Sequence, residues 1–138
     1  MLKAIRDGVF AASYCALIYW LSDQPSIDMP SLFAYQDKVH HAGAYALMAI
    51  LAWRFFRHLI SDPFSIASIA LVFSSVFGLT DELHQALIPF RAADWLDWFA
   101  DTIGAGVSTM AGYYIIRRPI AAQQTQTTAP RSLPNDEP

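Results

Sequence analysis

The chain has 138 residues, of which 54% are hydrophobic and 15% are charged, and its formal net charge is −3. This length fits one domain, and the composition is more apolar and less charged than that of an average soluble domain. The negative net charge argues against nucleic-acid binding, which requires a basic surface. A single cysteine, Cys15, excludes an intrachain disulfide.

Four uncharged runs divide the chain at its charged residues. They have lengths of 15, 15, 18 and 15 and cover residues 8–22, 39–53, 63–80 and 102–116. A helix that crosses a bilayer core needs about 20 residues, so these lengths alone also fit the helices of a soluble bundle. The runs predict helices at about 5–22, 38–58, 63–84 and 94–117. The polar segment 119–138, which contains several prolines, is predicted to be a disordered cytoplasmic tail.

The positions of the lysine and arginine residues favour a membrane protein. Lys38 and Arg91 lie in the connections after the first and third runs, and the other seven basic residues lie in the remaining connection or towards the termini. If all four helices cross a membrane, this is the positive-inside distribution with both termini cytoplasmic. Aromatic residues near the run ends fit an aromatic belt: Tyr19, Trp20, Tyr35, Trp53, Trp95, Trp98, Tyr113 and Tyr114. We therefore expect an all-α polytopic membrane protein, a compact bundle of four transmembrane helices; the alternative is a soluble four-helix bundle.

Helices this short would place charged residues within the thickness of the membrane. Such residues are costly there and normally face the bundle interior, where they pair with one another. Helical spacing puts the polar residues on single faces: Asp37, His41 and Tyr45; Asp94, Asp97, Asp101, Gly104 and Ser108; and Glu82 and Gln85, with Asp81 and His84 beside them. We expect these faces to converge on one pocket open to the extracytoplasmic side. Gly104 and Gly106 are expected to allow close helix contact.

Three sequence blocks, in this order, resemble the VanZ-like family of small bacterial membrane proteins. They are DKVHHAGAY (Asp37–Tyr45), DELHQ (Asp81–Gln85) followed by Arg91, and DWLDWFADTIGA (Asp94–Ala105). The positions that match the family pattern are Asp37, Lys38, His41, Tyr45, Asp81, Glu82, His84, Gln85, Arg91, Asp97, Asp101 and Gly104. Asp101 stands where many relatives carry Asn, and His40 lies outside the pattern.

The resemblance implies a multi-pass protein of the bacterial cytoplasmic (inner) membrane with a polar site on its outer face. It does not imply a reaction. The founding member of the family is associated with low-level resistance to the glycopeptide teicoplanin, whose target is a cell-wall precursor outside the membrane. That phenotype does not transfer to this chain, since most such proteins occur away from resistance clusters.

Three hypotheses for the pocket remain open. It could bind an anionic cell-envelope lipid, a cell-wall precursor or a glycopeptide-like ligand, through Asp37, Lys38, Tyr45, Asp81, Gln85, Arg91, Asp97 and Asp101. It could instead belong to a membrane enzyme doing acid–base, phosphoryl or acyl chemistry on a lipid-linked substrate, with His41, Glu82 and His84 as candidate catalytic groups. In the third hypothesis there is no ligand, and the helices are locked by ion pairs: Asp37–Lys38, Glu82–Arg91, and Asp97 with His41 or His84.

The motif search assigns no nucleophile, cofactor or metal. The chain contains no GxSxG, P-loop or HExxH motif, and no pair of candidate ligands has the spacing of a zinc motif. Asp37 and His41, joined by Glu82, His84 or Asp97, would offer mixed oxygen and nitrogen ligands. A divalent metal is therefore kept only as a variant of the enzyme hypothesis.

Overall fold

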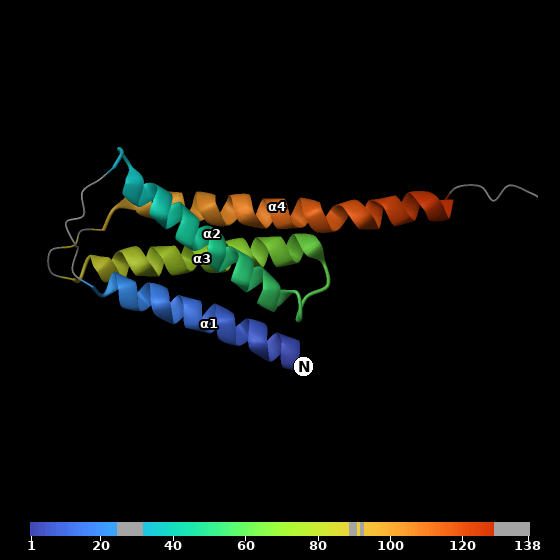
Figure 1. Cartoon of the computed structure of the whole chain (residues 1–138), viewed down its shortest axis with the longest axis horizontal. Coiled ribbons are helices and arrows are strands. Elements are labelled where there is room, and N and C mark those ends of the chain that lie inside the picture. The colour runs from blue at the N-terminus through green and yellow to red at the C-terminus, as the bar shows by residue number, and fades with distance from the viewer. Residues whose placement is uncertain (25–31, 89–90, 92, 129–138) are drawn as a thin grey trace, which may run out of the picture.

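The structure is a computed structural model that describes residues 1–24, 32–88, 91 and 93–128, with side chains up to Arg117. Within these residues it contains four helices and no strand: α1 (Leu2–Ser22), α2 (Gln36–Phe56), α3 (Pro63–Gln85) and α4 (Trp95–Thr128) (Figure 1). The prediction of an all-α chain with four helices is confirmed.

Helix α4 is longer than expected. It ends at Thr128 instead of residue 117, and therefore includes the first part of the segment predicted to be a disordered tail. That part contains Ala and Gln, which are good helix formers, and no glycine that would favour a helix end; Pro119, which is unfavourable inside a helix, does not end it. Residues 129–138 of the predicted tail lie outside the described residues.

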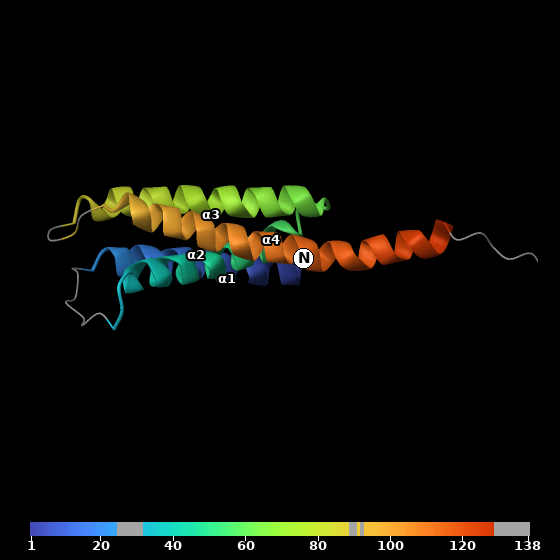
Figure 2. The ribbon, with the colours of Figure 1, turned by 90° about the horizontal axis from the view of Figure 1, so that it is seen from above.

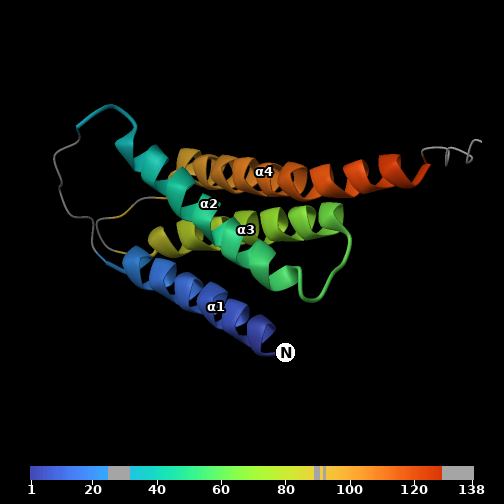
Figure 3. The same cartoon turned by 45° about the vertical axis from the view of Figure 1, so that its right-hand side comes forward.

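Successive helices run in opposite directions, so the chain forms an up-and-down bundle (Figure 1). Helices α2, α3 and α4 pack against one another, whereas α1 lies against α2, touches α3 less and makes no contact with α4 in the described part of the chain. Two further views show α4 extending past the other helices (Figures 2 and 3). The end of the bundle that contains Ser22, Lys38, Glu82 and Asp97 is called the acidic end below.

Two apolar clusters hold the helices together. One joins α2 to α3 and α4 and is built on Ala52, Trp53, Ile66 and Ala70. The other joins α1 to α2 through Ile18, Tyr45 and Met48. Trp53 is buried at 7% exposure, which corrects its assignment to an aromatic belt. It is a core residue because α3 and α4 both pack over its ring.

Glycines permit the closest helix contacts. A Cβ on Gly104 of α4 would lie 2.0 Å from the carbonyl oxygen of Ala42 in α2, so this position requires glycine. A Cβ on Gly106 would meet only Leu71 Cδ1, at 3.9 Å, which is ordinary van der Waals contact. The prediction of a close contact is therefore right for Gly104 and wrong for Gly106, which faces a flexible side chain instead of a helix backbone.

The start of α3 carries a well-formed N-terminal cap. Asp62 Oδ2 accepts hydrogen bonds from the backbone N–H and from the Oγ of Ser65, each at 2.7 Å, and Pro63 occupies the first turn. The bond from the Ser65 hydroxyl, followed by the one from its backbone N–H, holds the pKa of Asp62 below its ordinary value. These interactions end the α2–α3 connection sharply and fix the direction in which α3 enters the bundle.

Many large apolar side chains are exposed on the surface of the bundle, and several polar side chains are buried beside its apolar clusters. Exposed large side chains include Phe10, Leu17, Ile50, Val72, Val76, Ile103, Val107 and Met110. Buried polar side chains include Ser74 and Thr109 in addition to those of the acidic end. By length and composition, however, α3 is the one helix in the described residues that qualifies as a membrane span.

The opposite end of the bundle contains a separate ion cluster around the buried Asp7. Asp7 Oδ2 lies 2.9 Å from His58 Nε2, and Asp7 Oδ1 accepts hydrogen bonds from Arg6 and from Arg54 at 2.8 Å and 3.1 Å. Because Arg54 and His58 belong to the end of α2 and the turn after it, this cluster ties the start of α1 to α2.

Candidate functional site

Polar side chains from three helices meet at the acidic end. Lys38, His41 and Tyr45 come from the first turns of α2, Asp81, Glu82 and Gln85 from the last turns of α3, and Asp97 and Asp101 from the first turns of α4. The four carboxylates among them are buried. Spacing of three or four residues places each set on one helix face, and the packing of α2, α3 and α4 turns these faces towards one another.

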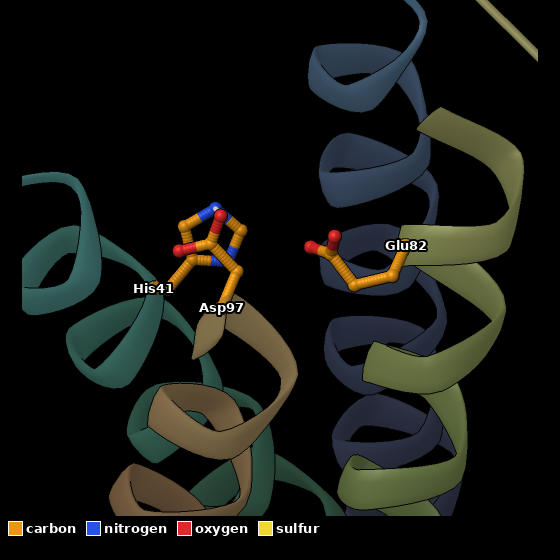
Figure 4. A group of neighbouring side chains, drawn as sticks. All are labelled: His41, Glu82 and Asp97. Atoms are coloured by element: carbon orange, nitrogen blue, oxygen red, sulfur yellow. Dashed lines mark ion pairs between the residues drawn. The ribbon is translucent and has the colours of Figure 1, made fainter. Parts of the chain in front are cut away.

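His41 is held between two carboxylates of α4. Its Nδ1 lies 3.1 Å from Asp101 Oδ1, and its Nε2 lies 3.9 Å from Asp97 Oδ2. The first distance is that of a hydrogen bond, whereas the second is too long for one. Figure 4 shows His41 and Asp97 close together, with Glu82 extending from α3 towards them. The hydrogen bond to Asp101 Oδ1 fixes the orientation of the imidazole ring.

Lys38 is surrounded by carboxylates. Its Nζ lies 2.8 Å from Asp37 Oδ2 and 2.7 Å from Asp97 Oδ1, and it also binds Asp94 Oδ2. The sequence predicted Lys38 as a ligand-binding cation, but here its three donors are directed at acidic side chains. Asp37, whose side chain is mostly exposed, lies at the rim of the site. The predicted Asp37–Lys38 ion pair is present.

Asp94 has a larger role than sequence reasoning gave it. Besides binding Lys38, its backbone N–H donates to Glu82 Oε2 at 2.8 Å, and its Oδ1 accepts from the Leu96 N–H at 2.9 Å. Asp94 directly precedes α4, and an acidic residue at that position is a helix-capping signal. That signal could have identified Asp94 as the residue that positions both α4 and the Glu82 carboxylate.

Tyr45, Asp81 and Gln85 form the inner side of the site. Gln85 Nε2 donates to Asp81 Oδ2 at 3.1 Å, which leaves Asp81 Oδ1 without a hydrogen-bond partner in the described residues. The buried Tyr45 hydroxyl is also unpartnered there. A Cβ on Gly78 would lie 2.9 Å from Asp101 Oδ2 and 3.2 Å from Tyr45 Cε1, so this glycine lets α3 approach both side chains.

Two predicted site residues lie apart from the cluster. His84 stacks on Tyr19 of α1, with ring centroids 4.6 Å apart, and its Nε2 lies 3.4 Å from Asp23 Oδ1. Arg91 donates from NH1 to the carbonyl oxygen of Ser22 at 2.8 Å. The expected Glu82–Arg91 ion pair is not formed in the described part of the chain. Glu82 Oε2 instead accepts a hydrogen bond from the backbone N–H of Asp94, the residue before α4.

A pocket of about 160 Å³ lies beside the cluster, between α1, α2 and α3. Ile18 and Leu21 form its apolar side. Its polar side is lined by His40, His41, Tyr45, Asp81, Gln85 and Arg91. His40, which lies outside the sequence pattern, therefore faces the same space as His41. The pocket combines an apolar wall with the Arg91 guanidinium, the Asp81 carboxylate and several hydrogen-bonding groups.

A family model described as VanZ/LLP1 matches residues 10–117, which include all three sequence blocks and every side chain that builds the acidic end. No curated protein and no solved structure matches the chain.

Proposed function

The chain belongs to the VanZ/LLP1 family, and from that premise we propose that its four helices cross the bacterial cytoplasmic membrane and that its pocket binds the anionic head group of a cell-envelope amphiphile. Such an amphiphile is a phospholipid or a lipid-linked cell-wall precursor. The pocket is proposed to open on the extracytoplasmic side, where the positive-inside rule places the acidic end.

Two observations support the membrane topology. Large apolar side chains cover the outside of the bundle, and a surface of this kind suits a lipid environment. Most Lys and Arg residues belong to the start of α1, to the region where α2 ends, or to the chain from the later part of α4 onwards: Lys3, Arg6, Arg54, Arg57, Arg117, Arg118 and Arg131. The two other basic residues, Lys38 and Arg91, belong to the acidic end, and so few are expected there if that end faces outward.

Reporter fusions test this topology. Alkaline phosphatase, which is active only outside the cytoplasm, is expected to be inactive when fused after Arg57 and active when fused after Leu87. A green fluorescent protein reporter at the same two positions is expected to give the opposite pattern, after normalisation to protein abundance. Phosphatase activity after Arg57 would contradict the proposed orientation.

The ligand proposal rests on the position of Arg91 and on its unused hydrogen-bond donors. It lines the pocket and uses one donor on the Ser22 carbonyl, and it has no ion pair among the described residues. A guanidinium has five N–H donors in a planar fork that fits phosphate and carboxylate groups. Lys38, by contrast, is already bound by three carboxylates. Arg91 is therefore the cation best placed to receive an anionic head group.

The space along α1 supports an amphiphile over a soluble anion. Beyond the polar pocket, a further cavity of about 280 Å³ lies between α1, α2 and α3. Gly8, Ala11 and Cys15 of α1 and Phe55 and Phe73 line it, with almost no polar surface. A ligand with a head group near Arg91 and an acyl chain along α1 would use both regions, because α1 is the least tightly packed helix.

Native mass spectrometry of the detergent-solubilised protein tests the binding proposal. With phosphatidic acid and phosphatidylcholine as probes, the wild-type protein is expected to retain phosphatidic acid preferentially. Arg91→Ala should reduce that retention about tenfold or more, because a charge-assisted contact is lost. Arg57→Ala, which removes an exposed arginine at the opposite end, is the matched control and should behave like wild type. Equal retention by both variants would refute the assignment.

One observation favours a second candidate, an enzyme acting on a lipid-linked substrate. His41 lines the pocket and is oriented by Asp101, an arrangement that suits a general base. A catalytic role predicts that His41→Gln abolishes turnover while the protein still inserts and retains phosphatidic acid. A purely structural role predicts that the same change lowers protein abundance.

A further inference from the structure

The carboxylates at the acidic end outnumber the cations that contact them. Asp81, Glu82, Asp97 and Asp101 are all buried, while Lys38 reaches only Asp97 among these four. Carboxylates in a low-dielectric interior require pairing, protonation or a bound cation. Three ligand atoms from three helices face one another, and this geometry favours a bound cation.

We infer that His41, Glu82 and Asp97 bind one divalent transition-metal ion, of the Zn²⁺ or Mn²⁺ class, at the acidic end. One side-chain nitrogen or oxygen from each residue lies within 4.8 Å of the others. Neighbouring or opposite ligands of an octahedral ion with bonds of about 2.1 Å lie about 3.0 to 4.2 Å apart. Small side-chain rotations therefore bring these atoms to bonding distance.

His41 is prepared to act as a metal ligand. When its Nδ1–H donates to Asp101 Oδ1 at 3.1 Å, the lone pair of Nε2 remains available on the side of Asp97. Metal-bound histidines commonly donate their other ring nitrogen to a carboxylate, which fixes the tautomer and raises the basicity of the ligand. Asp101 is 0% exposed, so it is a positioning residue and not a solvent-accessible ligand.

The Glu82 carboxylate gives a second, independent indication that a cation binds here. It is 2% exposed, its Oε2 is fixed by the Asp94 N–H, and its Oε1 has no hydrogen-bond partner in the described residues. Figure 4 shows this carboxylate directed towards His41 and Asp97. A buried carboxylate oxygen without a donor is costly, and a cation between the three side chains would satisfy it.

A second acidic group at the same end does not fit a metal. Asp37, Asp94 and Asp97 also lie close together, but the Lys38 ammonium already binds all three. In the His41–Glu82–Asp97 group Lys38 contacts Asp97 alone, through Oδ1, whereas Asp97 Oδ2 is the oxygen that faces His41. One imidazole nitrogen with two carboxylates, and no thiolate, favours Zn²⁺ or Mn²⁺ over copper(I) and over the all-oxygen sites of Mg²⁺ or Ca²⁺.

Metal binding is tested on full-length protein in detergent, purified without a polyhistidine tag, stripped with a chelator and given no lipid ligand. The wild type is expected to bind one Zn²⁺ or Mn²⁺ per chain by elemental analysis and to unfold at a higher temperature with the ion. Glu82→Gln and Asp97→Asn should lower affinity about tenfold or more, as should Asp101→Asn through His41. Asp23→Asn, which removes an exposed carboxylate from the same end, is the matched control and should bind as wild type does.

Several results would overturn the inference. Wild-type protein that binds neither ion, or an Asp23→Asn variant that loses as much affinity as Glu82→Gln, would do so. A further contradicting result is that neither the wild type nor Glu82→Gln binds an ion and the metal-free variant is the more stable of the two. The buried carboxylates would then be neutralised by protons and not by a metal. Should the ligand variants fail to fold, X-ray absorption of Zn²⁺-loaded wild type decides, since sulfur ligands or the absence of imidazole would refute the site. Because no lipid is present, failure here leaves the amphiphile proposal standing.

Discussion

Replacing Gly104 with alanine is expected to destabilise the protein by about 3 kcal/mol, at the upper end of what overpacking costs. The added Cβ would lie 2.0 Å from the Ala42 carbonyl oxygen and 2.7 Å from its carbonyl carbon. These atoms belong to a helix backbone, so the clash cannot be relieved by turning a side chain. Helices α2 and α4 must separate, which would also pull Asp101 and Asp97 of α4 away from His41.

The matched control is Gly106→Ala, two residues further along the same helix. Its Cβ would meet Leu71 Cδ1 at 3.9 Å, and alanine is the better helix former by up to about 1 kcal/mol. We expect unchanged or slightly increased stability. Thermal unfolding of both variants in detergent measures the difference. Equal unfolding temperatures would mean that α2 and α4 do not approach as closely as described.

Trp53→Ala is expected to cost about 3–5 kcal/mol, because it removes a large buried ring and leaves a cavity that the helices cannot fully close. The ring packs with Ile66 and Ala70 of α3 and lies 3.7 Å from where a Cβ on Gly112 of α4 would be. One substitution thus weakens the contacts of three helices. The loss should appear in detergent unfolding and as increased cleavage by protease.

Trp95→Ala is the control for the loss of a tryptophan as such. Trp95 is 60% exposed at the start of α4, and exposed substitutions usually change stability by no more than about 0.5 kcal/mol. Both variants lose one indole, so a difference between their stabilities reports the difference in burial. If Trp95→Ala is as damaging as Trp53→Ala, Trp53 does not hold the core in the way its burial indicates.

Helical periodicity accounts for much of the acidic end but not for all of it. His41 and Tyr45, or Asp97 and Asp101, are four residues apart and therefore had to share a face whatever the fold. His84 was grouped with Glu82 because the two are close in sequence. Two residues correspond to about 200° around a helix, so His84 turns to Tyr19 of α1 while Glu82 faces α2 and α4. Sequence proximity was the wrong guide there.

The composition and the spacing of charges determined the number of helices, the gathering of acidic residues at one end and the need for those residues to face inward. Only the tertiary structure decided the remaining partners: Lys38 with Asp94 and Asp97, Asp94 with Glu82, Arg91 with the Ser22 carbonyl, and Trp53 in the core. The physical reason is that periodicity fixes angles within one helix. Which side chains meet across helices depends on how each helix rotates and slides against its neighbours, and that is set by contacts such as Gly104 on Ala42.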